Sequence, residues 1–423
     1  MNATRHRLRY YASFNPSKSS LHGLPDDTEV VFVPMEAVSE TGGIDISMSR
    51  PLGSVYSGFT FFASGDVLIA KITPCFENGK GALVPELHRK IGFGSTEFHV
   101  LRPGPKLEGR FLHYVTRSTI FRDNGAAEMK GAAGQQRVPE DFVKNFQIWT
   151  PPLTVQRAIA DFLDRKTAAI DALVDKKERF IRLLTEKRAA LIHHAVTKGL
   201  NPDAPKMDSG IPLIGAIPAH WDVRKLRYIA ARLQGRLIVQ PHLYFADEGV
   251  PIVFGYNIKE GKILEDGLSK ITFEADRQHS HARARAGDLY TIRLGDPGMT
   301  AVVPPSLEGC HFASIMWIHK HPRFDSHWLC HCMNSRVVQG QIEAVNYGAA
   351  QTQFNISEAV DFVLPFPPRD EQAAIAAHVT KLLEQNSAVR SRVSAQLDRL
   401  HEYRKALITA AVTGQLDLGE PSP

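Results

Sequence analysis

The strongest constraint on the fold of this chain is an internal duplication. A segment that starts at Pro151 recurs from Pro367 without a gap, and the difference in numbering is constant at 367 − 151 = 216. Across residues 151–200, 17 of the 50 aligned pairs are identical, far more than unrelated sequences share. Two copies of one segment have to adopt one kind of structure, so any interpretation has to explain both at once.

Both copies have the pattern of a long amphipathic helix. In the second copy, inward-facing positions alternate in steps of four and three, which is the heptad spacing of a coiled-coil seam. A helix of roughly 40 residues is longer than most globular helices and cannot bury such a stripe alone. We therefore predict that the two helices pair, the alternative being that each packs only on its own domain. The predicted seam consists of Ile375, Val379, Leu382, Asn386, Val389, Val393, Gln396, Leu400, Tyr403 and Leu407, with Ile159, Leu163, Lys166, Ile170, Leu173, Lys177, Phe180, Leu184, Lys187 and Leu191 as counterparts.

The expected helix ends also match between the copies. Thr154 and Asp370 follow the Pro-Pro pairs and are residue types that cap helix N-termini. Gly199 and Gly414 are placed to end the helices, because glycine adopts the left-handed conformation that follows a helix.

The segment before the first helix has the pattern of a mixed, mainly β domain. Short apolar runs are bounded there by Gly, Pro and Asp, which is typical of strands. Its start, Leu8–Ala12, recurs as Leu226–Ala230, so the duplication extends beyond the helices. We expect strands at Val30–Val33, Val67–Ala70, Phe98–Leu101 and Phe146–Trp149, and one helix over Phe111–Phe121.

The chain therefore divides into two scaffold helices and two diverged domains. A scaffold that stays constant while its domains vary indicates one assembly function and two different recognition functions. The predicted boundaries are 1–150 for the first domain, 151–200 for the first helix, 201–220 for a connector, 221–366 for the second domain, 367–416 for the second helix and 417–423 for a disordered tail.

Composition narrows the class of protein. A net charge of +5 and a pI near 8.9 permit nucleic acid as a partner without requiring it. No apolar run approaches the ~18 residues that a membrane span needs, and no signal peptide is evident, so we expect a cytoplasmic protein. Four cysteines are too few and too unevenly spaced for a disulfide framework.

Two matched features are the best candidates for contacts with DNA. Gly65–Lys71 and Gly287–Arg293 each predict a turn and a buried strand that ends in a cation. Downstream, each domain has a loop of small residues and amides; Gln pairs geometrically with adenine and Arg with guanine in the major groove. A solvated polar loop is the alternative. The predicted DNA-binding residues are Lys71, Gln135, Gln136, Arg137, Arg293, Gln351 and Gln353.

No catalytic, cofactor-binding or metal-binding residues are predicted. A nuclease site would need a carboxylate cluster with a lysine, and its closest match is Asp247, Glu260 and Lys262, which we interpret as a hairpin turn. Cys330 and Cys332 are one residue apart on an expected helix, so they point to different faces, unlike zinc ligands. We expect them to be buried structural residues.

Taken together, these motifs resemble the specificity subunit of a type I restriction-modification system over nearly the whole chain. The resemblance rests on the Pro-Pro-x-x-x-Gln helix starts at Pro151 and Pro367, the lead-in Ile211–Trp221 and the two Ala-Val-Thr helix ends. It implies an α+β fold, with two mixed, mainly β target recognition domains separated by two long helices that pair as an antiparallel coiled coil. The first domain lacks a lead-in of the Ile211–Trp221 type.

The resemblance also implies a non-catalytic protein with specific partners. Each domain would read one half of an asymmetric, bipartite site in double-stranded DNA. The chain would dock two modification subunits that bind S-adenosylmethionine and methylate adenine, and restriction subunits that use ATP and Mg, with no cofactor of its own. A divergent nuclease and a coiled-coil scaffold that binds only proteins are the alternatives, but a scaffold gives no reason for two diverged domains.

Overall fold

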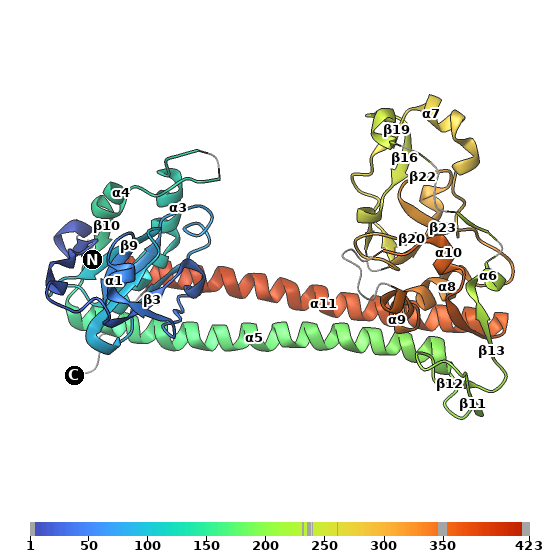
Figure 1. Cartoon of the computed structure of the whole chain (residues 1–423), viewed down its shortest axis with the longest axis horizontal. Helices are drawn as coiled ribbons and strands as arrows, with labels where there is room; N and C mark the ends of the chain where they lie inside the picture. The colour runs from blue at the N-terminus through green and yellow to red at the C-terminus, as the bar shows by residue number, and fades with distance from the viewer. Residues whose placement is uncertain are drawn as a thin grey trace. The chain divides into compact units, whose positions relative to one another are not determined.

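The computed structural model describes residues 5–416, except for residues 133, 231, 235–237, 239, 260 and 346–352. The chain divides into unit 1, Met1–Glu178 with Ser394–Pro423, and unit 2, Arg179–Val393. Two long helices, α5 (Leu153–Lys198) and α11 (Arg369–Val412), contribute to both units (Figure 1). The predicted disordered tail, 417–423, lies outside the described residues.

Unit 1 contains two four-stranded sheets, which confirms the predicted mixed β domain. Their strand orders are β2-β9-β6-β7 and β4-β3-β8-β5, and β3 and β8 form the one parallel pair of these two sheets in the described residues. Strands at three of the predicted places are β3, β6 and β9. The bounds are β2 Ala12–Phe14, β3 Glu29–Val33, β4 Ser49–Pro51, β5 Thr60–Ala63, β6 Val67–Ala70, β7 Gly81–Leu83, β8 Ile91–Gly94 and β9 Phe98–Pro103.

Unit 2 also contains two four-stranded sheets, and the first of them has the same strand order as the first sheet of unit 1. Its sheets have the orders β14-β23-β20-β21 and β15-β19-β16-β22, again with a parallel pair, β16 and β22. The domains that diverged in sequence have therefore kept the topology of the first sheet, whereas the parallel pair of the second sheet is central in unit 1 and lies at one edge in unit 2. The bounds are β14 Leu233–Gln234, β15 Phe245–Ala246, β16 Val250–Val253, β19 Lys270–Ile271, β20 Leu289–Ile292, β21 Thr300–Val302, β22 His311–Phe312 and β23 Ile315–Ile318.

In each domain, a short antiparallel pair of strands lies just before the long helix that follows the domain in the chain. In unit 1, β1 (Arg5–Arg7) pairs with β10 (Gln147–Trp149), the fourth predicted strand; in unit 2, β13 (Asp222–Lys225) pairs with β24 (Val363–Phe366). The remaining strands and α-helices are α1 Leu52–Val55, α2 Gly109–Arg117, α3 Thr119–Ala127, α4 Glu140–Asn145, β11 Lys206–Asp208, β12 Ala216–Pro218, α6 Leu226–Ile229, β17 Ile258–Lys259, β18 Lys262–Ile263, α7 Phe273–Gln278, α8 Ser326–Met333, α9 Arg336–Val345 and α10 Ile356–Ala359.

The single helix predicted over Phe111–Phe121 is wrong, because the chain forms two helices there. Ser118 has an extended backbone, with φ −64° and ψ 147°, and separates α2 from α3. Its hydroxyl accepts a hydrogen bond from the Phe121 amide at 3.3 Å and caps α3. A serine within an apolar helical pattern is thus a cap here, a role for which its residue type is well suited.

The long helices begin at Leu153 and Arg369, one residue before the predicted caps. The carbonyls of Pro152 and Pro368 accept the first helical bonds, from Gln156 N at 3.0 Å and Gln372 N at 2.9 Å. Thr154 and Asp370 therefore lie inside the first turn, and the prediction that they are caps is wrong. The missing N–H of a proline costs nothing at a helix start, so the Pro-Pro pair itself forms the boundary.

Gln156 and Gln372 explain the Pro-Pro-x-x-x-Gln motif. Each side-chain amide donates to the carbonyl of the first proline of its motif, at 2.8 and 2.9 Å. Each side-chain oxygen accepts from the N-cap residue of a domain helix, Glu108 of α2 and Asp325 of α8, at 2.9 and 2.8 Å. Both glutamines are at most 1% exposed. The motif therefore joins each long helix to its domain.

Both predicted glycine ends are confirmed. Gly199 and Gly414 have φ values of +70° and +74°, a conformation that other residues rarely adopt. A Cβ at Gly199 would lie 3.0 Å from the Trp221 ring, and a Cβ at Gly414 would lie 3.2 Å from the Trp149 ring. Trp149 of β10 thus covers the C-terminal end of α11, and Trp221 of the lead-in covers the C-terminal end of α5.

The two long helices run antiparallel, as predicted. In unit 1, Asp171 of α5 pairs with Arg404 of α11 at 3.0 Å, and Lys177 donates to Gln396 at 2.6 Å, so residue numbers rise along one helix as they fall along the other. In unit 2, the Asn386 side chain donates to the Leu184 carbonyl at 3.1 Å.

The predicted seam is wrong at every second position, where the inward residue is the one that follows the predicted residue in the chain. Leu173, Phe180, Val389 and Tyr403 are 38–55% exposed. The residues that follow them lie inward instead, and the Arg404 side chain is only 11% exposed. Inward positions thus include polar and charged residues that an apolar pattern does not mark. The observed inner positions in the centre of the helices are Thr167, Ile170, Val174, Lys177, Ile181, Leu184 and Arg188 in α5, and Leu383, Asn386, Arg390, Val393, Leu397, Leu400 and Arg404 in α11.

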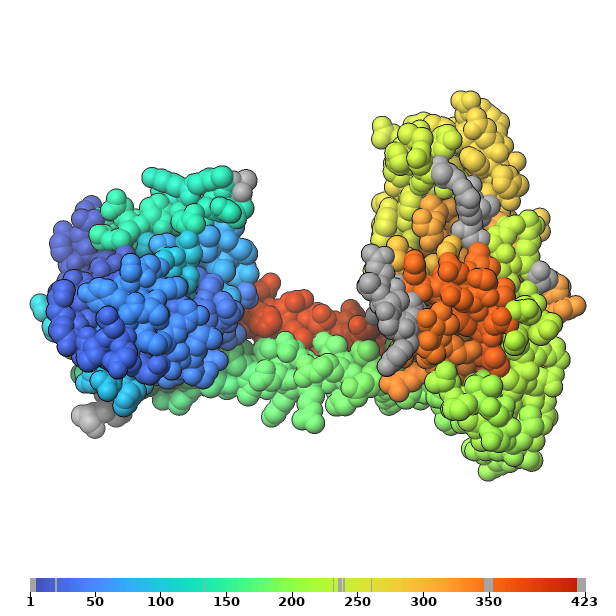
Figure 2. Space-filling view, viewed as in Figure 1, coloured from blue at the N-terminus to red at the C-terminus, as the bar shows by residue number. Residues whose placement is uncertain are grey.

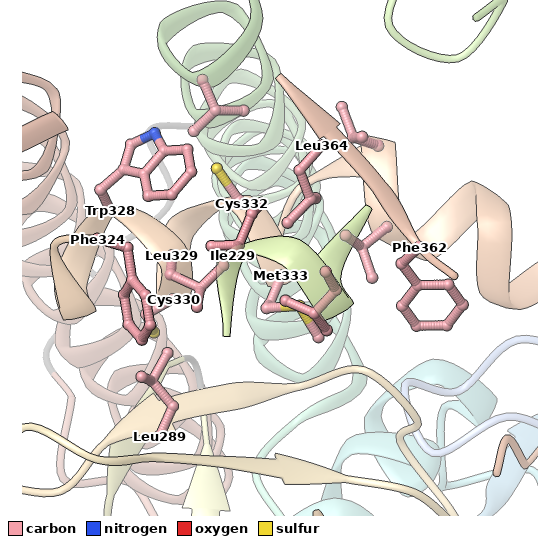
Figure 3. Packing of buried hydrophobic residues seen from close by; sticks show 14 of the residues in the cluster. Ile229, Leu289, Phe324, Trp328, Leu329, Cys330, Cys332, Met333, Phe362 and Leu364 are labelled. Atoms are coloured by element: carbon pink, nitrogen blue, oxygen red, sulfur yellow. The ribbon is translucent and has the colours of Figure 1, made fainter. Parts of the chain in front are cut away.

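Each unit has a hydrophobic core between its domain and its part of the helix pair. In unit 2, helix α8 lies at the centre of this core, where Trp328, Leu329 and Met333 are fully buried (Figure 3). Ile192 of α5 and Val379 of α11 belong to the same cluster. In unit 1 the corresponding core joins Phe111 of α2 to both long helices. The helices are therefore part of each folded unit.

Candidate nucleic-acid interface

In unit 1 the structure brings Lys71 together with the amide loop. Lys71 directly follows the buried strand β6, and its carbonyl accepts from Val138 N at 2.8 Å. The next residue, Ile72, forms a β-bridge with Arg137. Two features that are far apart in the sequence thus meet at one end of the inner strand.

The loop is held by its backbone and presents its side chains outward. Lys130 and Arg137 close it with two backbone hydrogen bonds of 3.0 and 2.9 Å. The Gln136 carbonyl accepts from Thr73 N at 2.9 Å, while Gln135 is exposed and Gln136 half-buried. Figure 2 shows the segment around this loop, in teal, at the surface of unit 1. Lys130 is exposed beside the loop and was not among the predicted residues.

Arg137 already has a carboxylate partner. Its guanidinium donates two hydrogen bonds to Glu97, at 2.9 and 2.8 Å, and these bonds are the main reason that the pKa of Glu97 lies below its usual value. The Arg137 side chain is 45% exposed, and exposed ion pairs contribute little net stability. A contact between Arg137 and guanine therefore requires an exchange of partner. No local sequence signal points to Glu97, because it lies far from the loop along the chain.

A buried histidine supports the loop from below. The His99 ring is 5% exposed, and its Nε2–H donates to the Val138 carbonyl at 2.9 Å. Burial lowers the pKa of His99 below its ordinary value, so the ring is neutral at pH 7. It fixes the residue that follows Arg137 without adding charge to the site.

Unit 2 has the equivalent arrangement at Arg293. This residue follows the buried strand β20, and its carbonyl accepts from Phe354 N at 3.3 Å. Leu294 forms a β-bridge with Gln353, just as Ile72 does with Arg137. The two residues that form these bridges, Arg137 and Gln353, are separated from each other by the duplication offset, 353 − 137 = 216. Gln353 is exposed, and Gln351 lies outside the described residues.

The electrostatic surroundings of the two sites differ. In unit 1, β6 ends with Ala70 opposite Phe98, and the residue before Phe98 is Glu97, which therefore lies next to the site. In unit 2, β20 ends with Ile292 opposite Ile315, and the residue before Ile315 is Ser314. Arg293 donates instead to the Phe354 carbonyl and to the Asn355 side chain, both at 3.3 Å. One backbone frame thus carries different side chains, Arg137 and Gln353, with different neighbours in the two units.

The nuclease alternative falls partly outside the described residues, since Glu260 is not among them. Its neighbours form the predicted hairpin, in which Lys259 of β17 pairs with Lys262 of β18. Among the residues that the structure describes, no group of His, Cys, Asp and Glu side chains is arranged to hold a metal ion. Cys330 and Cys332 are buried in α8, as expected, and burial raises the pKa of Cys330 to about 12.

Comparisons with known proteins agree with these features. Residues 27–179 match the family model of the type I restriction modification DNA specificity domain. The predicted resemblance to type I specificity subunits is confirmed. Two Escherichia coli specificity subunits are similar to parts of the chain: that of EcoAI is 42% identical over 137 residues, and that of EcoEI is 36% identical over 168 residues.

These alignments cover 32% and 39% of the chain but only 23% and 28% of the two subunits. The EcoKI specificity subunit of Escherichia coli strain K12 aligns more widely, with 21% identity over 93% of the chain and 80% of its own length.

The specificity-subunit fold extends along the chain. A chain from a structural study of the assembly and conformational transition of a type I restriction-modification system matches with a TM-score of 0.70, 20% identity and 98% coverage of both chains. The HsdS subunit of Thermoanaerobacter tengcongensis matches with a TM-score of 0.55 and 18% identity over 98% of this chain and 97% of its own. At these identities the likeness concerns the fold. None of the helices in the described part of the chain has the length and hydropathy needed to cross a bilayer.

Proposed function

We propose that this chain is the DNA sequence-recognition subunit of a type I restriction-modification complex. Unit 1 reads one half of a bipartite site and unit 2 reads the other. The observation that carries the proposal is the equivalence of Arg137 and Gln353, which occupy the same bridge on the same backbone frame in two units. The specificity domain matched over residues 27–179 supports the same conclusion.

The difference between the two residues favours an asymmetric target. Arginine forms bidentate hydrogen bonds with guanine and glutamine with adenine, so one frame with two readers selects two different base sequences. Lys71 and Arg293 lie beside these readers and supply charge for phosphate contacts, which position a protein on DNA without specifying sequence.

The helix pair has a separate role in this proposal. Each long helix is built into both domain cores, so the number of helical residues between the cores determines how many unread base pairs separate the half-sites. Dimeric DNA-binding proteins impose half-site spacing by the same kind of geometry.

In this proposal, partner subunits carry out the catalytic reactions. Modification subunits, two per chain, bind S-adenosylmethionine and methylate adenine after flipping it from the helix, and restriction subunits use ATP and Mg. The complex acts in the cytoplasm. This chain contributes no catalytic group and no cofactor site.

Methylome sequencing of cells with and without this chain tests the proposal. We expect adenine methylation at one asymmetric, bipartite motif to disappear when the chain is deleted and to return when it is supplied again. Purified chain incubated with DNA and S-adenosylmethionine is expected to leave the DNA unmethylated until the modification subunit is added. An unchanged methylome, or methylation by the chain alone, would contradict the assignment.

A further inference from the structure

A cavity of about 610 Å³ lies in unit 1 between the domain and the two long helices. Its walls come from the junction of α2 and α3, from the loops around Thr41 and Gly79, and from the facing stretches of α5 and α11, all within unit 1. Lys71, Gln135 and Arg137 are not among the residues that line it. Small-molecule sites are typically about 300–1,000 Å³ in volume. The cavity thus has the size of a ligand site and is separate from the candidate DNA-binding residues.

Three guanidinium groups line this cavity. Arg117 of α2 and Arg404 of α11 both donate to the Thr41 carbonyl, Arg404 at 3.2 Å. Arg122 of α3 donates to two loop carbonyls, the nearer being that of Phe76 at 2.9 Å. Arg122 is only 7% exposed, and its buried Nε–H has no acceptor among the described residues. A buried donor without an acceptor is costly, so this wall of the cavity is suited to a ligand that accepts hydrogen bonds.

The carboxylate in contact with these groups does not balance their charge. Asp171 pairs with Arg404 at 3.0 Å, and in the described part of the chain it is the one carboxylate that bonds any of the three arginines. Three positive charges against one leave an excess of 3 − 1 = 2. The pKa of His113 falls to about 3, first because the ring is buried and then because all three guanidinium groups disfavour its protonated form. The three cations therefore act on one small region.

The alternative is that the arginines only hold the loops in place, but unit 2 forms the same frame without two of them. Ser118 and Ser335 follow α2 and α8 in the same way, since each hydroxyl donates at 2.7 Å to the carbonyl three residues earlier. At this offset, 335 − 118 = 217, Asn334 and Gln339 stand where unit 1 has its two domain arginines. The arginine of the long helix has a counterpart in Arg188, at 404 − 188 = 216. Folding thus gives no reason for the two further cations of unit 1.

The charges of the cavity favour a small dianion. A phosphate group carries about −1.5 to −2 charges at neutral pH, which matches the excess, and its oxygens accept hydrogen bonds from guanidinium groups on several sides. The DNA backbone carries the same group, but four exposed carboxylates also line the cavity and repel a long polyanion; they are Glu40, Glu77, Asp123 and Asp175. A free phosphate ion or a small phosphate monoester can pass between them.

We propose that this cavity is a binding site for a small phosphate-bearing ligand, held by Arg117, Arg122 and Arg404. The site goes beyond the proposed function, because neither the reading of DNA nor the spacing of half-sites requires it. The three arginines come from α2, α3 and α11, so the bound ligand joins the domain to the long helix and stabilises unit 1.

Titration calorimetry of the full chain with sodium phosphate tests the proposal, with sodium chloride at equal ionic strength as the reference. The variants are Arg117→Gln and Arg122→Gln. Arg399→Gln is the matched control, because it removes an exposed arginine from the part of α11 that belongs to unit 1. We expect one phosphate per chain and an equal Kd for the wild type and the control. Each variant should raise this Kd about tenfold or more, because a charge-assisted hydrogen bond is lost.

Two further measurements keep the test independent of folding. Arg117→Lys keeps the charge and loses the planar fork, so it should bind phosphate more weakly than the wild type and more tightly than Arg117→Gln. Phosphorus-31 NMR of phosphate with the wild-type chain measures binding without any variant. A wild type that binds no phosphate, or Gln variants with the Kd of the wild type, would overturn the proposal. An equal loss of affinity in the Arg399→Gln control would also overturn it, because it would mean that net charge alone attracts the ion.

An arm with duplex DNA distinguishes the two sources of phosphate. We expect the Arg117→Gln and Arg122→Gln variants to bind DNA with the same Kd as the wild type. Weaker DNA binding by these variants, together with no binding of free phosphate by the wild type, would assign the arginines to the DNA backbone and overturn the proposal.

Discussion

Arg137 and Gln353 occupy equivalent positions in the two units: each forms the β-bridge to the second residue after the inner strand of its domain. The frame around them is the same, while the side chain that it presents is different. Under the proposed function, the backbone therefore fixes where the side chain lies and the residue type fixes which base it reads, so that Arg137 and Gln353 can each be tested by substitution.

Single substitutions at these positions should affect one half-site each. Arg137→Ala is expected to relax the specificity of one half-site and Gln353→Ala that of the other, since a bidentate base contact contributes about 1–3 kcal/mol of discrimination. Competition binding with DNA altered in one half at a time measures this effect. Loss of discrimination at both half-sites from a single substitution would contradict one-unit, one-half-site reading.

Removal of the Glu97 carboxylate should strengthen binding to the half-site read by unit 1. Glu97 accepts two hydrogen bonds from the Arg137 guanidinium, so Glu97→Gln leaves that group available to DNA and removes a negative charge that repels phosphate. We expect a lower Kd, with a steeper dependence on salt concentration. Ser314→Ala in unit 2, at the equivalent place, is the control and should leave Kd unchanged. A higher Kd for Glu97→Gln would show that the ion pair itself is the binding-competent state.

Loss of either anchoring glutamine should destabilise its own unit. Gln156→Leu and Gln372→Leu leave the backbone N–H of Glu108 or Asp325 without an acceptor in a buried place, which costs about 1–3 kcal/mol. Thermal unfolding measures the loss as a lower Tm. Gln278→Leu, at an exposed position of α7, should leave Tm unchanged. Equal Tm values for all three variants would mean that the shared motif has no structural role.

Lengthening both long helices should change the gap in the DNA target and nothing else. Insertion of one heptad into each helix near the middle adds roughly 10 Å, at about 1.5 Å per residue, and keeps the inward pattern in register. Methylome sequencing is expected to show unchanged half-sites with a longer unread gap, by about three base pairs at roughly 3.4 Å per step. A heptad in one helix only, which breaks the pairing, should abolish methylation. Altered half-site sequences would contradict separate reading and spacing.

Acid should destabilise unit 2 through His331. Burial lowers the pKa of His331 from 6.5 to about 4 in the folded chain, so below pH 6.5 the unfolded chain binds the proton and the folded chain does not. The stability that the neutral ring contributes is complete above pH 6.5 and decreases as pH falls toward 4, by on the order of 3 kcal/mol. His331→Gln should flatten the dependence of Tm on pH in this range, whereas His378→Gln, on the exposed face of α11, should not. Parallel profiles for the wild type and His331→Gln would exclude this group as a source of acid sensitivity.

The sequence was informative where one element repeats or where a strand is buried on both faces. The constant offset between the two copies identified the helices, and the runs Val67–Ala70 and Phe98–Leu101 became the inner strands β6 and β9. It also placed Lys71 and Arg293 at the ends of equivalent strands. The meeting of Lys71 with Arg137 was not deducible, because nonlocal strand pairing creates it.

The prediction of the seam shows a different limit. Apolar character favoured Leu173 and Phe180 as inward residues, yet the inward places belong to Val174 and Ile181, and further on to Arg188. A helix surface places neighbouring residues about 100° apart, so a small rotation exchanges them. The domains that pack on the helix ends fix this rotation, and a pattern confined to the helix does not contain it.

The bridge at Arg137 and Gln353 has a consequence for how such a chain changes over generations. Because backbone bonds to the segment after the inner strand hold this position, a change of one codon there alters the side chain and leaves those bonds in place. Each unit does so independently of its twin. Under the proposed function, a lineage carrying this frame would acquire a new DNA sequence in one half of its target while the other half, and the partner subunits, remain in use.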